Sequence, residues 1–405
     1  MTASSSERED YREAVCLNRA RTDLNGARGS DAPELPAKNR NLQIDIFRGC
    51  GIILMVCGHS EFPLTHFVYL FHMAIFFILS GYLWNEKYSA DIESCKKYLI
   101  KKIHTLYFPY VAFNIIFTLF NNYFIRLNLY TDNPNFLNLP IGPNDTLTQK
   151  LSIKSFAIEI LKILLFMGGN QFAGASWFLR ILFFVSILNL AVQYIDSHYK
   201  HGIYIDYLIL IFCLLAAQAI SSIELSLHNA IKPFFISYVA LKIGVFIKKK
   251  KIMEKLSQRY LFIYLFITSF IVLLVFSQYG YVSMAKGKVT NIIYFMITSI
   301  SGWFMMFILS KYLEQFKFAK FFSIIGKNSI WIIFLHFLSF KLISFAYIFI
   351  KQLDILYLAM FPVIHNINYL WIGYVIIGIL MPIIIKELYC KIIRNKYIKK
   401  ITLGK

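Results

Sequence analysis

Long apolar runs separated by short polar connectors dominate this chain from residue 43 onward. About ten of these runs are long enough to cross a bilayer, because a membrane-spanning helix needs about 20 mainly apolar residues. They are the segments 43–62, 66–85, 103–125, 177–195, 203–222, 230–247, 259–277, 291–310, 328–350 and 369–386. The pattern predicts an all-α, polytopic integral membrane helix bundle with about ten transmembrane helices.

A further apolar segment, residues 153–167, has a different pattern. Its charged residues Lys154, Glu159 and Lys162 recur at near-helical spacing, opposite a stripe of apolar positions. This arrangement is typical of an amphipathic helix that lies in the membrane interface. We therefore do not count the segment as a span.

The distribution of lysine and arginine supports this count. Basic residues gather in the connectors at 96–102, 248–251, 311–327 and 386–400. Cytoplasmic loops carry an excess of such residues, and all four clusters fall on the cytoplasmic side when 153–167 lies flat. If that segment spanned the membrane, every later cluster would be inverted. We expect both termini to be cytoplasmic.

Composition agrees with a membrane protein. The chain is 58% hydrophobic and 17% aromatic, and its mean hydropathy is +0.57. The formal net charge of +20 comes from residues spread over connectors, which argues against a nucleic-acid-binding domain. The six cysteines are scattered without metal-ligand spacing, so we predict no disulfide framework and no metal site.

The chain divides into three parts by composition. Residues 1–40 are polar and of mixed charge, which predicts a disordered cytoplasmic tail without the apolar core of a signal peptide. Residues 41–390 hold the apolar runs and form the membrane domain. Residues 391–405 form a basic cytoplasmic tail.

The first run holds two residues that are costly to bury in a bilayer, Arg48 and His59. Eleven residues make about three helical turns, so both side chains project from one face, about 16 Å apart along the axis. That separation excludes a direct ion pair. Alternatively, Arg48 lies at the membrane edge and pairs with Asp45.

Three further titratable residues lie within predicted spans. They are His72 in the second span, Arg180 in "SWFLR" and His336 in "IGKNSIWIIFLH". Each has a structural alternative, because an intramembrane histidine can simply link helices by hydrogen bonds and Arg180 can reach the outer surface. Together with His59 they make four such groups from four spans, which nevertheless predict a polar cavity through the bundle.

Five segments then resemble successive motifs of the membrane acyltransferase 3 family, nearest to its fucose 4-O-acetylase-like branch. These are "NLQIDIFRGCGIILMVCGHS", "FHMAIFFILSGYLW", "KKIHTLYFPY", "SWFLRILFF" and "IGKNSIWIIFLH", in the family's order over about residues 40–340. Arg48 and His59 match the Arg-x10-His signature. Two departures are Ala74, where such proteins often have proline, and lysines at 101 and 102, where arginine is commoner.

The resemblance implies an enzyme that moves an acyl group, usually acetyl, from cytoplasmic acyl-CoA to a hydroxyl of a surface glycan or its lipid-linked precursor. It also implies a bacterial inner-membrane location, an acetyl-CoA co-substrate and no bound cofactor. O-antigen and capsule are acceptors of this class. The protein's expected partners are thus the donor, the glycan and membrane lipids.

Acyl transfer to a hydroxyl needs a proton acceptor and groups that stabilise the oxyanion. His59 is our candidate base, with a covalent acyl carrier as the alternative role. The catalytic candidates are His59, Arg48, His336 and Arg180; the donor-binding candidates are Arg48, Lys101, Lys102 and Tyr107; the substrate-binding candidates are His72, Trp177 and Arg180. For the two lysines membrane topology alone is an alternative explanation, and for Trp177 it is the aromatic belt at the membrane surface.

Two other functions also fit buried charges in a helix bundle. The first is a transporter or flippase of a lipid-linked sugar, and the second is a polysaccharide polymerase. Against a transporter, the sequence contains no internal repeat and no pair of interrupted helices. The long connector at 126–176, with "NPNFLNLPIGPND" and "MGGNQFAGASW", is either a grip for an extracytoplasmic substrate or a passive crossover.

Overall fold

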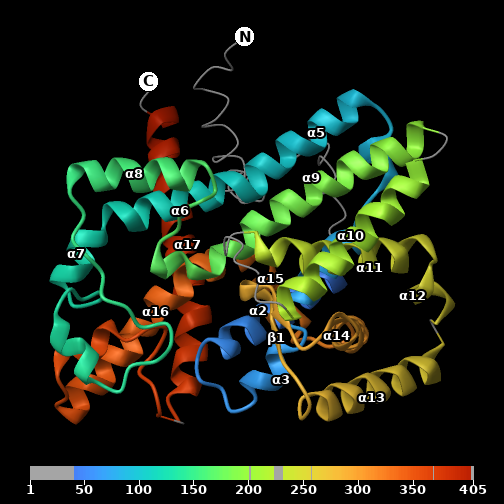
Figure 1. Ribbon diagram of the computed structural model, residues 1–405. Coiled ribbons are helices and arrows are strands. Elements are labelled where there is room, and N and C mark those ends of the chain that lie inside the picture. Colours follow the sequence, from blue (N-terminus) through green and yellow to red (C-terminus); the bar gives the residue numbers. More distant parts are fainter. Residues whose placement is uncertain (1–40, 200–201, 223–230, 257, 368, 403–405) are drawn as a thin grey trace.

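The computed structural model describes residues 41–199, 202–222, 231–256, 258–367 and 369–402 (Figure 1). The prediction for residues 1–40 lies outside these ranges. The α-helices are α2 (Leu42–Gly58), α3 (Thr65–Tyr69), α4 (Ala74–Tyr82), α5 (Ile92–Lys102), α6 (Phe108–Leu119), α7 (Asn121–Arg126), α8 (Ile153–Leu164), α9 (Trp177–His198), α10 (Gly202–Ser222), α11 (Lys232–Lys249), α12 (Ile252–Lys255), α13 (Arg259–Phe276), α14 (Ile292–Leu313), α15 (Ala319–Lys327), α16 (Ser329–Lys351) and α17 (Trp371–Thr402).

Shorter elements connect these helices. They are the 3-10 helices η1 (Glu86–Ser89), η3 (Pro134–Asn138), η4 (Gln171–Ser176), η5 (Met284–Lys286) and η6 (Ile355–Ala359), the π-helix η2 (Ile103–Tyr107), and the antiparallel strands β1 (Val282–Ser283) and β2 (Lys288–Val289). Helix α17 continues to Thr402, so its backbone includes most of the predicted basic tail.

Seven helical segments in the described ranges are long and apolar enough to cross a membrane. They are Thr65–Tyr82, Gln171–His198, Tyr204–Ser222, Arg259–Phe276, Ile292–Leu313, Ser329–Lys351 and Trp371–Ile392, and each matches one predicted run. The other three runs form α2, the η2–α6–α7 segment and α11. The predicted fold class, an all-α polytopic membrane helix bundle, is confirmed.

Two consecutive runs are interrupted, which the hydrophobic pattern does not predict. The second run breaks between α3 and α4, at residues 70–73. Ala74 begins α4, at the first helical position where proline is favoured because its missing N–H costs nothing there. The helix therefore restarts at this position with alanine instead of proline. The third run changes from the π-helix η2 to α6 and then, after Phe120, to α7.

Glycine contacts hold two helix pairs together. A Cβ added to Gly49 would lie 2.0 Å from the carbonyl oxygen of Phe322, and one added to Gly326 would lie 1.9 Å from that of Asp45. These contacts bring α2 and α15 backbone to backbone. Lipid supplies no hydrophobic driving force between helices. Small residues instead allow the backbones to approach closely, and the resulting van der Waals packing stabilises the pair. The first and last of the five motifs therefore pack on each other.

The second motif uses the same device. A Cβ on Gly81 would lie 1.9 Å from the carbonyl oxygen of Leu241, and one on Gly244 would lie 1.9 Å from that of Ile78. Helices α4 and α11 thus meet through reciprocal glycines.

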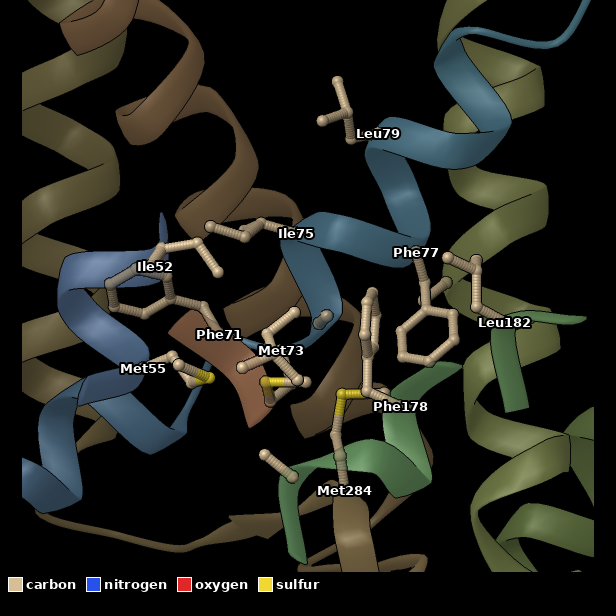
Figure 2. Close-up of a cluster of buried hydrophobic side chains, with 14 of the residues drawn as sticks. Ile52, Met55, Phe71, Met73, Ile75, Phe77, Leu79, Phe178, Leu182 and Met284 are labelled. Carbon is tan, nitrogen blue, oxygen red and sulfur yellow. The ribbon is translucent and has the colours of Figure 1, made fainter. Parts of the chain in front are cut away.

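The core lies where α2, α4, α9 and α14 meet. Figure 2 shows part of it, in which Phe77 of α4 lies against Phe178 of α9 with ring centroids 5.1 Å apart. Phe71 is buried at the α3–α4 break, and Gly302 of α14 leaves room for its side chain. The interrupted second run is thereby fixed by packing on both sides.

Helix α8 lies alongside α6 and runs in the opposite direction (Figure 1). Asn122 hydrogen-bonds the backbone of Leu151 just before α8, while Tyr107 donates to the carbonyl of Leu164 at its far end, 3.0 Å away. Exposed apolar side chains, including Ile153 and Leu161, cover its outer face. That face suits lipid contact, and the interfacial placement of the segment stays a prediction.

Candidate active site

Three of the four predicted intramembrane groups come together in the bundle. His59 caps the C-terminal end of α2, and its ring centroid lies 5.5 Å from that of His336 in α16. His72, in the turn between α3 and α4, stacks on Tyr69 with centroids 5.0 Å apart. The edge of Tyr69 in turn faces His59, with centroids 6.5 Å apart. We call His59, His72 and His336 the histidine group.

Backbone carbonyls determine which ring nitrogen carries hydrogen in two of these residues. Nδ1 of His336 lies 2.8 Å from the carbonyl oxygen of Ile332, and Nδ1 of His72 lies 3.0 Å from that of Val68. A carbonyl oxygen only accepts, so Nδ1 must donate and the Nε2 of a neutral ring keeps its lone pair. In the described part of the chain, Nε2 of His336 is buried and has no hydrogen-bond partner. It is a free proton acceptor beside His59.

Aromatic rings surround the histidine group. Phe337 lies 4.9 Å from His59 and 3.9 Å from His336 between ring centroids. Tyr69 donates a hydrogen bond to the carbonyl of Gly58, 2.7 Å away, and the missing side chain of Gly58 gives its ring room. His72 and His336 are buried, while His59 stays partly exposed. Burial strengthens the electrostatic interactions of the two buried rings.

A basic group lies about three helical turns before His59 along α2. It consists of Arg48, Lys101 and Lys102. Burial, followed by the nearby positive charges of Lys101 and Arg48, lowers the pKa of Lys102 to about 8. Arg48 also contacts Asp45, with 3.8 Å between Nη1 and Oδ1, so the pairing considered from the sequence is present. Crowded cations of this kind favour a bound anion.

Arg180, Tyr107 and Trp177 make their described contacts elsewhere. Nη1 of Arg180 donates to the carbonyl of Phe166, 3.2 Å away, and Tyr107 donates to the carbonyl of Leu164. Both side chains therefore hold the end of α8, and the predicted grouping of Arg180 with the three histidines is not supported by these contacts. Trp177 packs at a tilt against an aromatic ring of α4.

A further charged cluster connects three loops. His365 lies in the α16–α17 loop (residues 352–367), and its Nδ1 is 2.9 Å from Oε1 of Glu61 while its Nε2 is 2.9 Å from Oδ2 of Asp145. Hydrogen bonds that His365 donates to Asp145 and to Glu61 raise the pKa of His365 above its ordinary value, although burial opposes them. We call these three residues the loop clasp.

Lys341 fastens the same loop to α16. Its side chain is buried, and Nζ donates to the carbonyl of Leu358 at 3.0 Å and to that of Met360. The ammonium also lies 5.9 Å from the ring centroid of Phe172 in η4. A buried charge needs such partners, because leaving it unpaired is expensive.

The site residues predicted from the sequence did not include Lys341 or the residues of the loop clasp. Lys341 stands inside the apolar run 328–350, so the rule that flagged His336 in the same run applies to it equally. Glu61, two residues after His59, offered a weaker signal. Asp145 and His365 lie in connectors remote from each other in sequence, and no local pattern joins them.

Within the described ranges, no group of three or more His, Cys, Asp or Glu side chains is arranged to hold a metal ion. The chain matches the family model described as an acyltransferase domain over residues 41–387. No curated protein and no solved structure matches it. The family match covers both members of the Arg-x10-His pair and all three histidines of the group.

Proposed function

This chain belongs to the acyltransferase 3 family and is a membrane acyltransferase, and we propose that its reaction is O-acetylation of a glycan. The donor is acetyl-CoA on the cytoplasmic side. The acceptor is a hydroxyl of a bacterial surface glycan, such as O-antigen or capsule, or of its lipid-linked precursor. The protein acts in the bacterial inner membrane.

The observation that carries this proposal is the meeting of His59 and His336, from opposite ends of the family match. The acceptor oxygen attacks the thioester carbonyl carbon, and its proton passes to a neutral histidine. The carbon–sulfur bond then breaks, and coenzyme A leaves as the thiol by taking that proton. We assign the base to His59 and a proton-holding role to His336, whose Nε2 is the free acceptor beside it.

The basic group fits the donor. Coenzyme A carries several phosphate charges, and Arg48, Lys101 and Lys102 can bind them by charge-assisted hydrogen bonds. The lowered pKa of Lys102 supports this assignment, because an anion placed among three cations relieves their mutual repulsion. The donor's thioester would then extend along α2 from Arg48 toward His59.

The test compares two histidines of the same segment. His59→Ala should lower acetyl transfer by at least about 100-fold, the usual contribution of a general base. His66→Ala is the matched control, because this exposed histidine of α3 bonds only the carbonyl of Gly280 among the described contacts, 2.9 Å away. The assay is radiolabelled acetyl transfer in membrane vesicles, with mass spectrometry of the polysaccharide. Normal acetylation in His59→Ala would refute the assignment.

A second variant addresses the donor. Arg48→Ala should raise the KM for acetyl-CoA while the amount of protein in the membrane stays normal. An unchanged KM would show that Arg48 serves only its contact with Asp45.

A further inference from the structure

A polar cavity of about 290 Å³ opens between the connector after α7, the end of α6 and the start of η4. Its walls include Asn121, Tyr130, Gln149, Glu159, Asn170 and Gln171. None of the site residues discussed above lines it. The cavity lies in the region 126–176, which the sequence left open as either a substrate grip or a passive crossover.

Hydrogen bonds shape the cavity without using all of its polar groups. Tyr130 donates to Oδ1 of Asn170, 2.5 Å away, and Asn121 donates to the carbonyl oxygen of Gln149, 3.3 Å away. These contacts fix the walls. Among the described residues, the side-chain amides of Gln149 and Gln171 form no hydrogen bond with the protein. Two amide groups, each with donors and an acceptor, are therefore available to a ligand.

The charge of the lining excludes an anionic occupant. Among the described residues that line the cavity, only Glu159 is charged, and it pairs with Lys162 at 2.7 Å. The adjacent Lys150 pairs with Asp132 at 3.1 Å. A phosphate or diphosphate would meet a carboxylate and no free cation, which electrostatics disfavours. The chemistry suits a neutral ligand rich in hydroxyl groups.

The size suits one small ring. Binding pockets for small molecules usually begin at about 300 Å³, so this cavity is at the small end of that range. It has the volume of roughly ten water molecules in the liquid. An aromatic ring, that of Tyr130, forms part of the wall and stacks on Phe172 with centroids 4.6 Å apart. The polar side chains of the lining suit the hydroxyl groups of a sugar.

The short helix η4 links this cavity to the histidine group. Gln171, its first residue, lines the cavity, and Gly174 lies three residues later. The backbone between the two positions is kinked at Ala173. A Cβ on Gly174 would lie 3.3 Å from the ring of Phe337, which itself contacts His59. The cavity is therefore near the reacting position but separate from it.

We propose that this cavity binds a neutral sugar unit of the acceptor glycan, next to the unit that is acetylated. The inference rests on the proposed glycan O-acetyltransferase function. Binding energy from a part of the substrate that does not react positions the part that does. Gln149 and Gln171 select the sugar by hydrogen bonds to its hydroxyls.

Direct binding tests the site without catalysis. The full-length protein in lipid nanodiscs is titrated with methyl glycosides of glucose, galactose, mannose, rhamnose, fucose and N-acetylglucosamine, and saturation-transfer NMR reports contact. We expect at least one glycoside to bind the wild type and His59→Ala alike. Binding should be lost in the double variant Gln149→Ala/Gln171→Ala. Gln315→Ala, an exposed residue between α14 and α15, is the matched control and should bind normally.

Kinetics supply the second measurement. The double variant should raise the KM for the acceptor glycan at least tenfold, with the KM for acetyl-CoA unchanged. Failure of all six glycosides to bind, or equal binding by the double variant, would overturn the sugar site. Acetyl transfer by the wild type in that case would leave the proposed function intact. Sugar binding without any acetyl transfer would instead refute the function and keep the site.

Discussion

We expect Asp145→Ala to release the α16–α17 loop from the body of the protein. The side chain of Asp145 is 0% exposed, and its carboxylate accepts three hydrogen bonds. Oδ2 accepts from Gly142 N at 2.6 Å and from Nε2 of His365 at 2.9 Å, while Oδ1 accepts from Phe361 N. One buried carboxylate thus holds two positions of the loop, in addition to the contacts of Glu61 and Lys341.

The free-energy cost of Asp145→Ala follows from the hydrogen-bond donors that lose their acceptor. Alanine removes both acceptor oxygens, so two donors of the loop, the N–H of Phe361 and Nε2 of His365, lose their acceptor. A buried donor without an acceptor costs about 1–3 kcal/mol. Because His365 is only partly buried, we take about 2–4 kcal/mol for the pair. A tenfold change corresponds to about 1.4 kcal/mol, so the loop's opening equilibrium should increase about 30- to 700-fold.

Hydrogen exchange with mass spectrometry measures this opening in nanodiscs. Peptides that contain Phe361 should lose protection by that factor. Asp132→Ala is the control, because Asp132 belongs to the same connector but forms an exposed pair with Lys150. Such pairs contribute about 0–1 kcal/mol, so the control should change protection less than about fivefold. Unchanged protection in Asp145→Ala, or an equal loss in both variants, would refute the reasoning.

Three further predictions concern other parts of the molecule. Carboxylate hydrogen bonds raise the pKa of His365 above 6.5, so its contribution to loop stability is complete below about pH 6.5 and disappears as pH rises through the raised value. Loop protection, corrected for intrinsic exchange, should therefore fall as the pH rises above about 6.5. Gly326→Ala should destabilise the protein by about 1–3 kcal/mol, since its Cβ would lie 1.9 Å from the carbonyl oxygen of Asp45, and thermal unfolding measures this. Lys242→Met should cost about 3–5 kcal/mol, because it leaves Asp206, its partner at 2.6 Å, buried without its charge partner.

Each of these has its own control. His365→Gln should make loop protection independent of pH, and a persisting pH dependence would assign it to another group. Gly373→Ala should be nearly neutral, because its Cβ would meet only ordinary contacts, at 3.4 Å or more, with Ile343. Replacing both Lys242 and Asp206 by apolar residues should restore stability. A double variant as unstable as the single one would contradict the ion-pair argument.

Hydropathy was sufficient for the type of fold. Each apolar run is a local property, since crossing a bilayer requires about 20 apolar residues and satisfied backbone hydrogen bonds wherever the run lies. The runs therefore predicted helices that the structure contains. They did not predict the break before Ala74, because the residues on both sides are apolar and tertiary packing around Phe71 and Gly302 decides it.

The candidate site divides in the same way. Arg48, His59 and His336 stand out in the sequence because each is costly in a membrane, and that cost is independent of the neighbours. The arrangement of these side chains in space, by contrast, depends on which helices pack together. Nothing local in the sequence says that His336 meets His59 while Arg180 turns to the carbonyl of Phe166.

By itself, the sequence determined that this protein is a helical membrane bundle, which residues are too costly to be incidental, and which family its motifs resemble. Only the tertiary structure decided which of those residues meet, and it added the loop clasp and the polar cavity. The physical reason is that burial preference is a property of one segment. Contact depends on which helices approach closely, and here reciprocal glycines such as Gly49 and Gly326 decide that by shape.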